Sequence, residues 1–359
     1  MKIKNIALVA LLSSSMMIGA ANAQLKITGY TEAEYSTGSS KNVQPGFRAA
    51  NGLWDAATAT TSVPSTPRMG NETSVRFQTD HSIPGGLTAT AMAEIRRNAN
   101  VWEEREVRLG AADGSWLVFA GADFQRGIEI ARTINPTVNN RVTDIVGSVT
   151  GLIDVIDSTS GNTYFGFEFP KAGPGRLSVA IMPNSDDTVA SGTDGTPTAA
   201  TNQGESRASI GYAGAVGNVT FGAGYLKGNN RIVGASDSEA YTIGARYTMA
   251  PFSIGFQHQD QDFAATANGQ AKTSQEQTTL SATYALTKEF SLGYAKTKAE
   301  QVNAGTKANT PGEVDQDLFQ AAYNFGPAVV QLDYVKVDDA QYVDAREINA
   351  VKAKLKVNF

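Results

Sequence analysis

The chain has no cysteine and only two histidines among its 359 residues. Without cysteine there is no disulfide bond and no thiol chemistry, so other forces must hold the fold together. After residue 23 the sequence has no apolar run of 18 residues, which excludes a transmembrane helix there. There is also no long basic run and the formal net charge is −5, so nucleic acid is not an expected partner.

The two histidines do not form part of a recognisable catalytic arrangement. A hydrolytic enzyme needs a nucleophile and a base within hydrogen-bond reach of each other. No serine or aspartate pattern brings such a partner beside His81 or His258. We therefore predict no enzymatic activity, no cofactor and no metal centre.

The first 23 residues have the pattern of an export signal. Lys2 and Lys4 precede an apolar run, and Ala21-Asn22-Ala23 has the small-x-small pattern of a signal-peptidase site. The alternative is an N-terminal membrane anchor, but Ser13 to Ser15 interrupt the apolar stretch and leave it short for a span. We expect a signal peptide at 1–23 and a single mature domain at 24–359.

The dominant hydrophobic period of the remaining chain is two residues, the period of a strand with one apolar and one polar face. Leu25 and Ile27 alternate with Lys26 and Thr28, and the final KAKLKVNF alternates lysine with apolar residues up to the chain end. The strand-like segments number sixteen: 25–35, 73–79, 87–96, 105–110, 116–122, 163–169, 176–182, 206–212, 218–225, 240–247, 252–257, 279–286, 289–295, 317–325, 328–334 and 348–359.

The connectors between these segments alternate between short and long. Short ones such as IPGG (83–86) contain the proline and glycine of tight turns. The long ones are mostly polar: 36–71, 123–161, 184–204, 228–238, 259–275, 297–315 and 338–345. Only the short connector 97–103 breaks the rhythm. Short strands in this order predict an antiparallel up-and-down meander.

The meander has the dimensions of a membrane barrel. A tilted strand crosses the bilayer with about 9–11 residues, and aromatic residues mark both edges of the apolar face, as in the girdles of outer-membrane barrels. In hydrocarbon every backbone polar group needs a protein partner, which only a closed sheet provides. We predict an all-β, transmembrane antiparallel barrel of about 16 strands, with short periplasmic turns, long outer loops and a lumen wide enough for water.

Odd and even positions of a strand face opposite sides of the sheet, and this parity assigns the charged residues to the lumen. A charge on the lipid face near the midplane costs about 2–4 kcal/mol, whereas a charge in a water-filled pore stays solvated. The predicted pore-wall residues are Arg76, Glu94, Arg96, Glu106, Arg108, Arg207, Arg246, Lys352, Lys354 and Lys356. The alternative interpretation is that Arg76, Arg96, Glu94 and Glu106 only form ion-pair ladders that stiffen the wall.

Several stretches resemble the general Gram-negative porins in their beta-proteobacterial form: ETSVRFQTDHSIPGGLTATAMAEI (72–95), REVRLGAADGSWLVFAGADFQ (105–125), YALTKEFSLGYAKTK (284–298) and the terminal Phe359. The resemblance implies a homotrimer, and it implies that Phe359 is an assembly signal for the outer-membrane insertion machinery. The chain also departs from the family. Ala122 rather than arginine follows Gly121, and no Pro-Glu-Phe-Gly-like sequence occurs, so the family's ion selectivity does not carry over.

The resemblance also implies that the loop at 123–162 folds into the lumen and narrows it. This loop is rich in isoleucine and valine, which need a surface to pack against, and long structured loops are usually functional. Its charged residues are Asp123, Arg126, Glu129, Arg132, Arg141, Asp144, Asp154 and Asp157. An acidic loop opposite a basic wall would create a transverse field that filters ions by sign. The alternative is an exposed adhesive or disordered loop.

The predicted function is a porin for passive diffusion of ions and small hydrophilic solutes in the outer membrane of a Gram-negative cell. The alternatives are a substrate-specific channel, and a loop-plugged barrel that serves as a structural protein or adhesin. Expected partners are outer-membrane lipid and lipopolysaccharide, beside the small solutes. The lysines near the C-terminus and the arginines of the early strands favour anions slightly. Acidic pairs such as Asp338-Asp339 are either solvated or bind divalent cations.

Overall fold

The computed structural model describes residues 24–40, 63–96, 101–122, 126–129, 131, 163–183, 206–229, 237–262, 273–303, 312–339 and 347–359. The predicted signal peptide at 1–23 lies outside these residues, as does most of the predicted constriction loop. No helix in the described part of the chain is long and apolar enough to cross a membrane.

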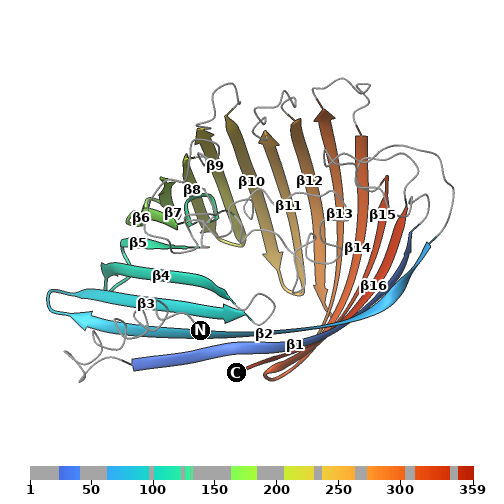
Figure 1. The fold of residues 1–359 in the computed structure, drawn as a ribbon, viewed down its shortest axis with the longest axis horizontal. Coiled ribbons are helices and arrows are strands. Elements are labelled where there is room, and N and C mark those ends of the chain that lie inside the picture. Colours follow the sequence, from blue (N-terminus) through green and yellow to red (C-terminus); the bar gives the residue numbers. More distant parts are fainter. Residues whose placement is uncertain are drawn as a thin grey trace, which may run out of the picture.

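The described strands form one closed antiparallel barrel (Figure 1). Each strand pairs with its neighbours in sequence, and the last pairs with the first. The predicted fold class and strand number are confirmed. The strands are β1 (Gln24–Ser40), β2 (Val63–Ile83), β3 (Leu87–Arg96), β4 (Val101–Ala111), β5 (Leu117–Ala122), β6 (Thr163–Glu168), β7 (Gly175–Met182), β8 (Ser206–Val216), β9 (Val219–Asn229), β10 (Ser238–Met249), β11 (Phe252–Asp262), β12 (Thr273–Ala285), β13 (Phe290–Asn303), β14 (Gly312–Phe325), β15 (Ala328–Asp338) and β16 (Ile348–Asn358).

Tight turns join the strands at one end of the barrel. Gly217 between β8 and β9 and Gly326 between β14 and β15 have φ of 57° and 72°, which favour glycine because it lacks a Cβ atom. In the β4–β5 turn the backbone N–H of Ser115 donates to Asp113 Oδ1 at 2.9 Å. This bond stabilises the carboxylate and lowers the pKa of Asp113.

The first hairpin is longer than the hydrophobic pattern predicted. The sequence placed a connector at 36–71, but β1 continues to Ser40 and β2 begins at Val63, with Ser40 opposite Val63. Strands β12 and β13 likewise pair out to Thr273 and Asn303. Ladder hydrogen bonds need no apolar side chains, so the strands continue into polar sequence beyond the apolar band.

The two faces of the sheet differ in composition. The outward face has a band of exposed apolar residues, with aromatic side chains such as Tyr294 and Phe319. The inward face is largely polar and buried, as for Glu94, Gln316 and Asp333. This alternation matches a wall that meets lipid on one side and surrounds a polar lumen on the other.

The barrel closes between β1 and β16 through lysines of the C-terminal stretch. Lys352 Nζ lies 2.6 Å from Glu34 Oε2, and Lys354 Nζ lies 3.3 Å from Glu32 Oε1. In the strand register Glu34 lies opposite Lys354, so each lysine pairs diagonally with a carboxylate on the neighbouring strand. These inward charges favour the observed register between β1 and β16, because a one-residue slip would move every lysine of β16 to the lipid face.

The terminal residue closes the same seam from the outside. The N–H of Phe359 donates to the carbonyl oxygen of Gly29 at 3.0 Å, and the N–H of Gly29 donates back to Phe359 at 2.9 Å. A Cβ atom on Gly29 would lie 2.8 Å from Cζ of the phenyl ring. Glycine at position 29 therefore lets the aromatic ring lie directly over the backbone of β1.

We predict that Lys354→Glu destabilises the barrel, because it places a third carboxylate beside Glu32 and Glu34. The side chains of Lys354 and Glu32 are only 11% and 9% exposed, so the expected loss is about 3 kcal/mol. The temperature at which the folded form converts to the unfolded form on a gel measures this loss. The charge-swapped variant Glu32→Lys/Lys354→Glu should recover part of it, because position 354 remains opposite Glu34 and position 32 remains opposite Lys356. If the swapped variant unfolds at no higher a temperature than Lys354→Glu does, the ion pair is not what stabilises the seam.

Candidate functional site

A charged sector of the lumen wall begins on β2 and β3. Arg76 on β2 binds Glu94 on β3 through Nε at 2.9 Å and Nη2 at 2.6 Å, both to Oε2. The hydroxyl of Ser74 donates to the other carboxylate oxygen at 2.7 Å. Glu94 is 3% exposed, and three donors stabilise its negative charge.

The sector continues on β4 and β6. Glu106 accepts a hydrogen bond from Arg108 Nε, two residues along the same strand, and another from the hydroxyl of Tyr164 at 2.7 Å. The ring of Tyr164 packs edge-on against Phe119 of β5 at a centroid distance of 5.8 Å. Aromatic packing therefore positions the phenol that satisfies this buried carboxylate.

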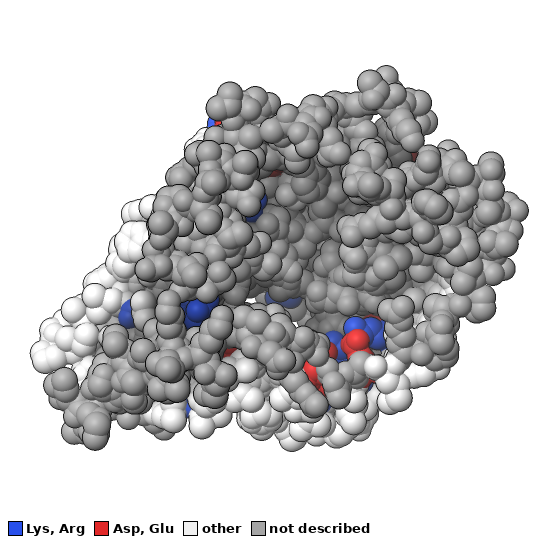
Figure 2. Space-filling model, viewed as in Figure 1, with Lys and Arg blue, Asp and Glu red and all other residues white. Residues whose placement is uncertain are grey.

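A further pair lies near the turn end of the barrel. Arg176 of β7 contacts Glu168 at the end of β6 at 3.2 Å and donates to the carbonyl oxygen of Gly114 at 2.6 Å. With the seam pairs of β1 and β16, this makes the charged sector run from β16 through β1–β4 to β6 and β7. Figure 2 shows acidic and basic side chains next to one another over the region of β1 and β16.

The predicted pore-wall residues are therefore not one basic cluster. Arg76, Arg108, Lys352 and Lys354 each lie beside a carboxylate, and Lys356 Nζ lies 3.6 Å from the centroid of the Tyr30 ring. Arg96 is opposite Ser74 in the register, but its side chain is outside the described part. The two remaining arginines are on other strands: Arg207 opposite Met182 and Arg246 opposite Gly255.

The opposite wall has a different character. Within the described residues, the inward face of β11–β14 carries no ionisable side chain. Amides and hydroxyls are frequent there: Gln257, Gln259, Gln261, Gln275, Gln277, Thr279, Thr297, Gln316 and Gln320. Part of the same face is apolar, with Val314 and Leu318 buried beside Val335 and Val337 of β15. The wall thus combines a charged sector with a neutral one.

The predicted constriction loop is described only at its start, where the short helix α2 (Arg126–Glu129) contacts β7, β8 and β9. Ile128 is fully buried with Leu226 of β9 and Ala240 of β10. Gly224 of β9 forms the floor of this recess, since a Cβ atom there would lie 2.6 Å from Ile128 Cγ1. Leu226, Ala240 and Gly224 all belong to the inward face, so α2 rests against the inside of the wall.

The charged loop residues named from the sequence are not placed. The backbone of Arg126 and Glu129 belongs to α2, but their side chains lie outside the described residues. The remaining six also lie outside them: Asp123, Arg132, Arg141, Asp144, Asp154 and Asp157. The acidic loop opposite a basic wall therefore stays a prediction.

Sequence reasoning omitted several residues that the structure brings to the charged wall: Glu32, Glu34, Tyr164, Glu168 and Arg176. The two-residue period puts Glu32 and Glu34 on the same polar face as Lys26 and Thr28, which is the available signal. Their pairing with lysines more than 300 positions away follows only from the β1–β16 register. Alternation with Phe165 and Phe167 puts Tyr164 on the polar face as well, but its hydrogen bond to Glu106 follows only from the fold.

Comparison with known proteins agrees with this architecture. OmpT of Vibrio cholerae superposes with a TM-score of 0.65 at 10% identity, covering 94% of this chain and 98% of that one. An anion-selective porin from Comamonas acidovorans gives a TM-score of 0.63 at 13% identity, covering 94% and 100%. OmpF of Salmonella typhi gives 0.62 at 11% identity, covering 93% and 97%.

A search of curated protein sequences finds no match. The sequence profile described as Gram-negative porin, however, matches residues 7–356. This match spans nearly the whole chain and accords with the closed barrel of 16 strands. The protein belongs to the Gram-negative porin family, whose members are channels of the outer membrane.

Proposed function

We propose that the protein is a general diffusion pore for ions and small hydrophilic solutes and that it has no enzymatic activity. The observation that carries this is the inward face of the closed barrel, which has paired charges on β16, β1–β4, β6 and β7 and amides and hydroxyls on β11–β14. A wall of amides, hydroxyls and paired charges offers hydrogen bonds to many solutes and specific recognition to none. A broad, weakly discriminating channel follows from that surface.

The pairing of the wall charges supports weak ion selectivity. The lysines of β16 suggested a preference for anions, but Lys352 and Lys354 lie beside Glu34 and Glu32. A paired charge adds little to the net potential that an ion meets in the pore. We propose that the described wall contributes only a slight preference for either sign, and that the charges of the loop at 123–162 add to it.

We also propose that the loop at 123–162 forms the constriction. Support comes from α2, whose Ile128 is buried against the inward face of β9 and β10. A chain that enters the loop in contact with the inside of the wall starts on a path into the lumen. The isoleucine- and valine-rich sequence that follows fits a segment that packs on this wall.

The remaining proposals concern export and assembly. We propose export through a cleaved signal peptide at 1–23 and insertion through recognition of Phe359, which directly follows β16 at the seam. OmpT of Vibrio cholerae is recorded in a trimer form, and a homotrimer in contact with lipopolysaccharide is proposed for this chain. The family and the barrel support an outer-membrane location.

The proposed function predicts a large, ohmic conductance when the purified protein is inserted into a planar lipid bilayer. The reversal potential in a tenfold salt gradient should be far smaller than the about 59 mV of an ideally selective pore. A small conductance that one solute class blocks would point to a substrate-specific channel. No conductance from correctly folded protein would point to a plugged structural or adhesive barrel.

The recess for Ile128 yields a second prediction. Gly224→Val should push α2 away from the wall, because the added Cβ would lie 2.6 Å from Ile128 Cγ1, which is closer than van der Waals contact allows. We expect an altered single-channel conductance while the barrel still folds and runs as the heat-modifiable form. The matched control is Gly224→Val/Ile128→Ala, which removes Cγ1, the atom in closest contact, leaves the backbone of Ile128 at 3.2 Å, and should restore part of the conductance of the unmodified protein. Unchanged conductance in Gly224→Val would show that α2 does not position the constriction.

A further inference from the structure

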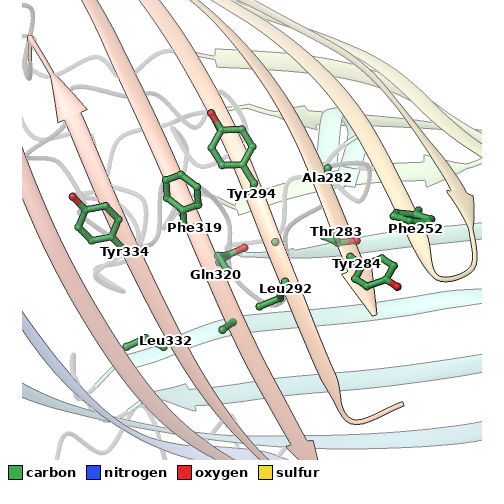
Figure 3. A pocket seen from close by; sticks show the side chains of 12 residues that line it. Phe252, Ala282, Thr283, Tyr284, Leu292, Tyr294, Phe319, Gln320, Leu332 and Tyr334 are labelled. Atoms are coloured by element: carbon green, nitrogen blue, oxygen red, sulfur yellow. The ribbon is translucent and has the colours of Figure 1, made fainter. Parts of the chain in front are cut away.

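The outward face of the barrel has an apolar groove over β11–β15. Its volume is about 540 Å³, and two alanines, Ala282 of β12 and Ala321 of β14, lie among larger side chains in its lining. In Figure 3 the rings of Tyr294, Phe319 and Tyr334 stand in a row across three neighbouring strands, with Leu292 and Leu332 beside them. Registers place Tyr294 opposite Phe319 and Phe319 opposite Tyr334, so the row is continuous.

Charged residues lie immediately above this aromatic row on the same strands and the same face. Lys296 follows Tyr294 by two residues, Asp317 precedes Phe319 by two, and Lys336 follows Tyr334 by two. The next level carries Lys298, Asp315 and Asp338, with Asp315 opposite both. We call these three lysines and three aspartates the ionic mosaic. It lies on the side of the groove away from the short turns.

Lys296 and Lys298 form only long ion pairs within the mosaic. Lys296 Nζ lies 3.7 Å from Asp315 and 3.6 Å from Asp317, and Lys298 Nζ lies 3.9 Å from Asp315. Only Lys336 makes a short contact, at 2.6 Å to Asp338. The side chain of Lys298 is 66% exposed. Exposed pairs at such distances contribute little, so another anion can replace the aspartate as a partner.

The groove and the mosaic together form a surface that suits a bound lipid better than a second protein chain. The groove offers an apolar bed for an acyl chain, and the aromatic row marks the level where headgroups begin. Lysine and aspartate are depleted from the centres of protein interfaces. One level further from the groove, the same outward face carries Glu276, Glu300 and Glu313. A layer of phosphate groups bridged by divalent cations presents cations to these carboxylates and phosphate oxygens to Lys296 and Lys298.

We propose that the outward face of β12–β15 binds an outer-leaflet lipid that carries several phosphate groups, as lipopolysaccharide does. One acyl chain lies in the groove over Ala282 and Ala321, and a headgroup phosphate contacts Lys296 and Lys298. This rests on the proposed lipopolysaccharide partnership and assigns it to a place on the barrel. It does not depend on what passes through the pore.

The test is lipid retention on purified, delipidated barrels, measured by native mass spectrometry after adding lipopolysaccharide or phosphatidylglycerol. Lys296→Gln/Lys298→Gln removes both positive charges and should lower lipopolysaccharide retention about tenfold. Ala321→Phe fills the groove without changing any charge and should also lower it. The matched control is Lys227→Gln on β9, which is outward and 47% exposed beside Glu239, but is not part of the groove lining.

Retention that falls in both site variants and not in the control supports the site. Equal retention of phosphatidylglycerol and lipopolysaccharide overturns the assignment to a lipid with several phosphates. Unchanged lipid retention together with a shift from oligomer to monomer in Ala321→Phe also overturns it, since the groove would then contact a second copy. The single-channel conductance of every variant should equal that of the unmodified protein. A failure of lipid binding is therefore distinguishable from a failure of the proposed pore function.

Discussion

The structure depends on one constraint: inside hydrocarbon, each backbone N–H and C=O must find a partner within the protein. A sheet satisfies this only if it closes, and here closure joins β1 to β16. The seam combines three interactions, namely ladder hydrogen bonds to Phe359, the outward ring over Gly29, and the inward ion pairs of Lys352 and Lys354. The alternation in KAKLKVNF is thus explained at both faces of the wall.

Closure also determines where charge can be placed. Inward side chains of β16, β1–β4, β6 and β7 carry paired acids and bases, while the described inward face of β11–β14 is neutral. On the outside, ionisable residues such as Lys296 and Asp317 come directly above the aromatic row. One barrel therefore presents two different electrostatic surfaces, a paired and partly neutral lumen and a mixed belt at the level of the lipid headgroups.

Much of the fold could be predicted from the sequence, because a two-residue period and a rhythm of short and long connectors are local properties. The sixteen strands and the up-and-down order were predicted in this way, and the strand ends were underestimated where pairing continues into polar sequence, as at Ser40 and Val63. The site was less predictable. Parity gives the face of Arg76 or Lys354, but the partner of each depends on the register between strands. The resemblance to porins did not indicate that Arg108, Lys352 and Lys354 lie beside carboxylates.

The central claim is that alternate residues of β16 face a conducting lumen and the lipid. The chain has no cysteine, so single cysteines can be introduced without a background. A charged, membrane-impermeant thiol reagent should react with Lys356→Cys and reduce the single-channel current. It should leave the current of Leu355→Cys unchanged, because that side chain is on the outward face. Equal responses at the two positions would contradict the account.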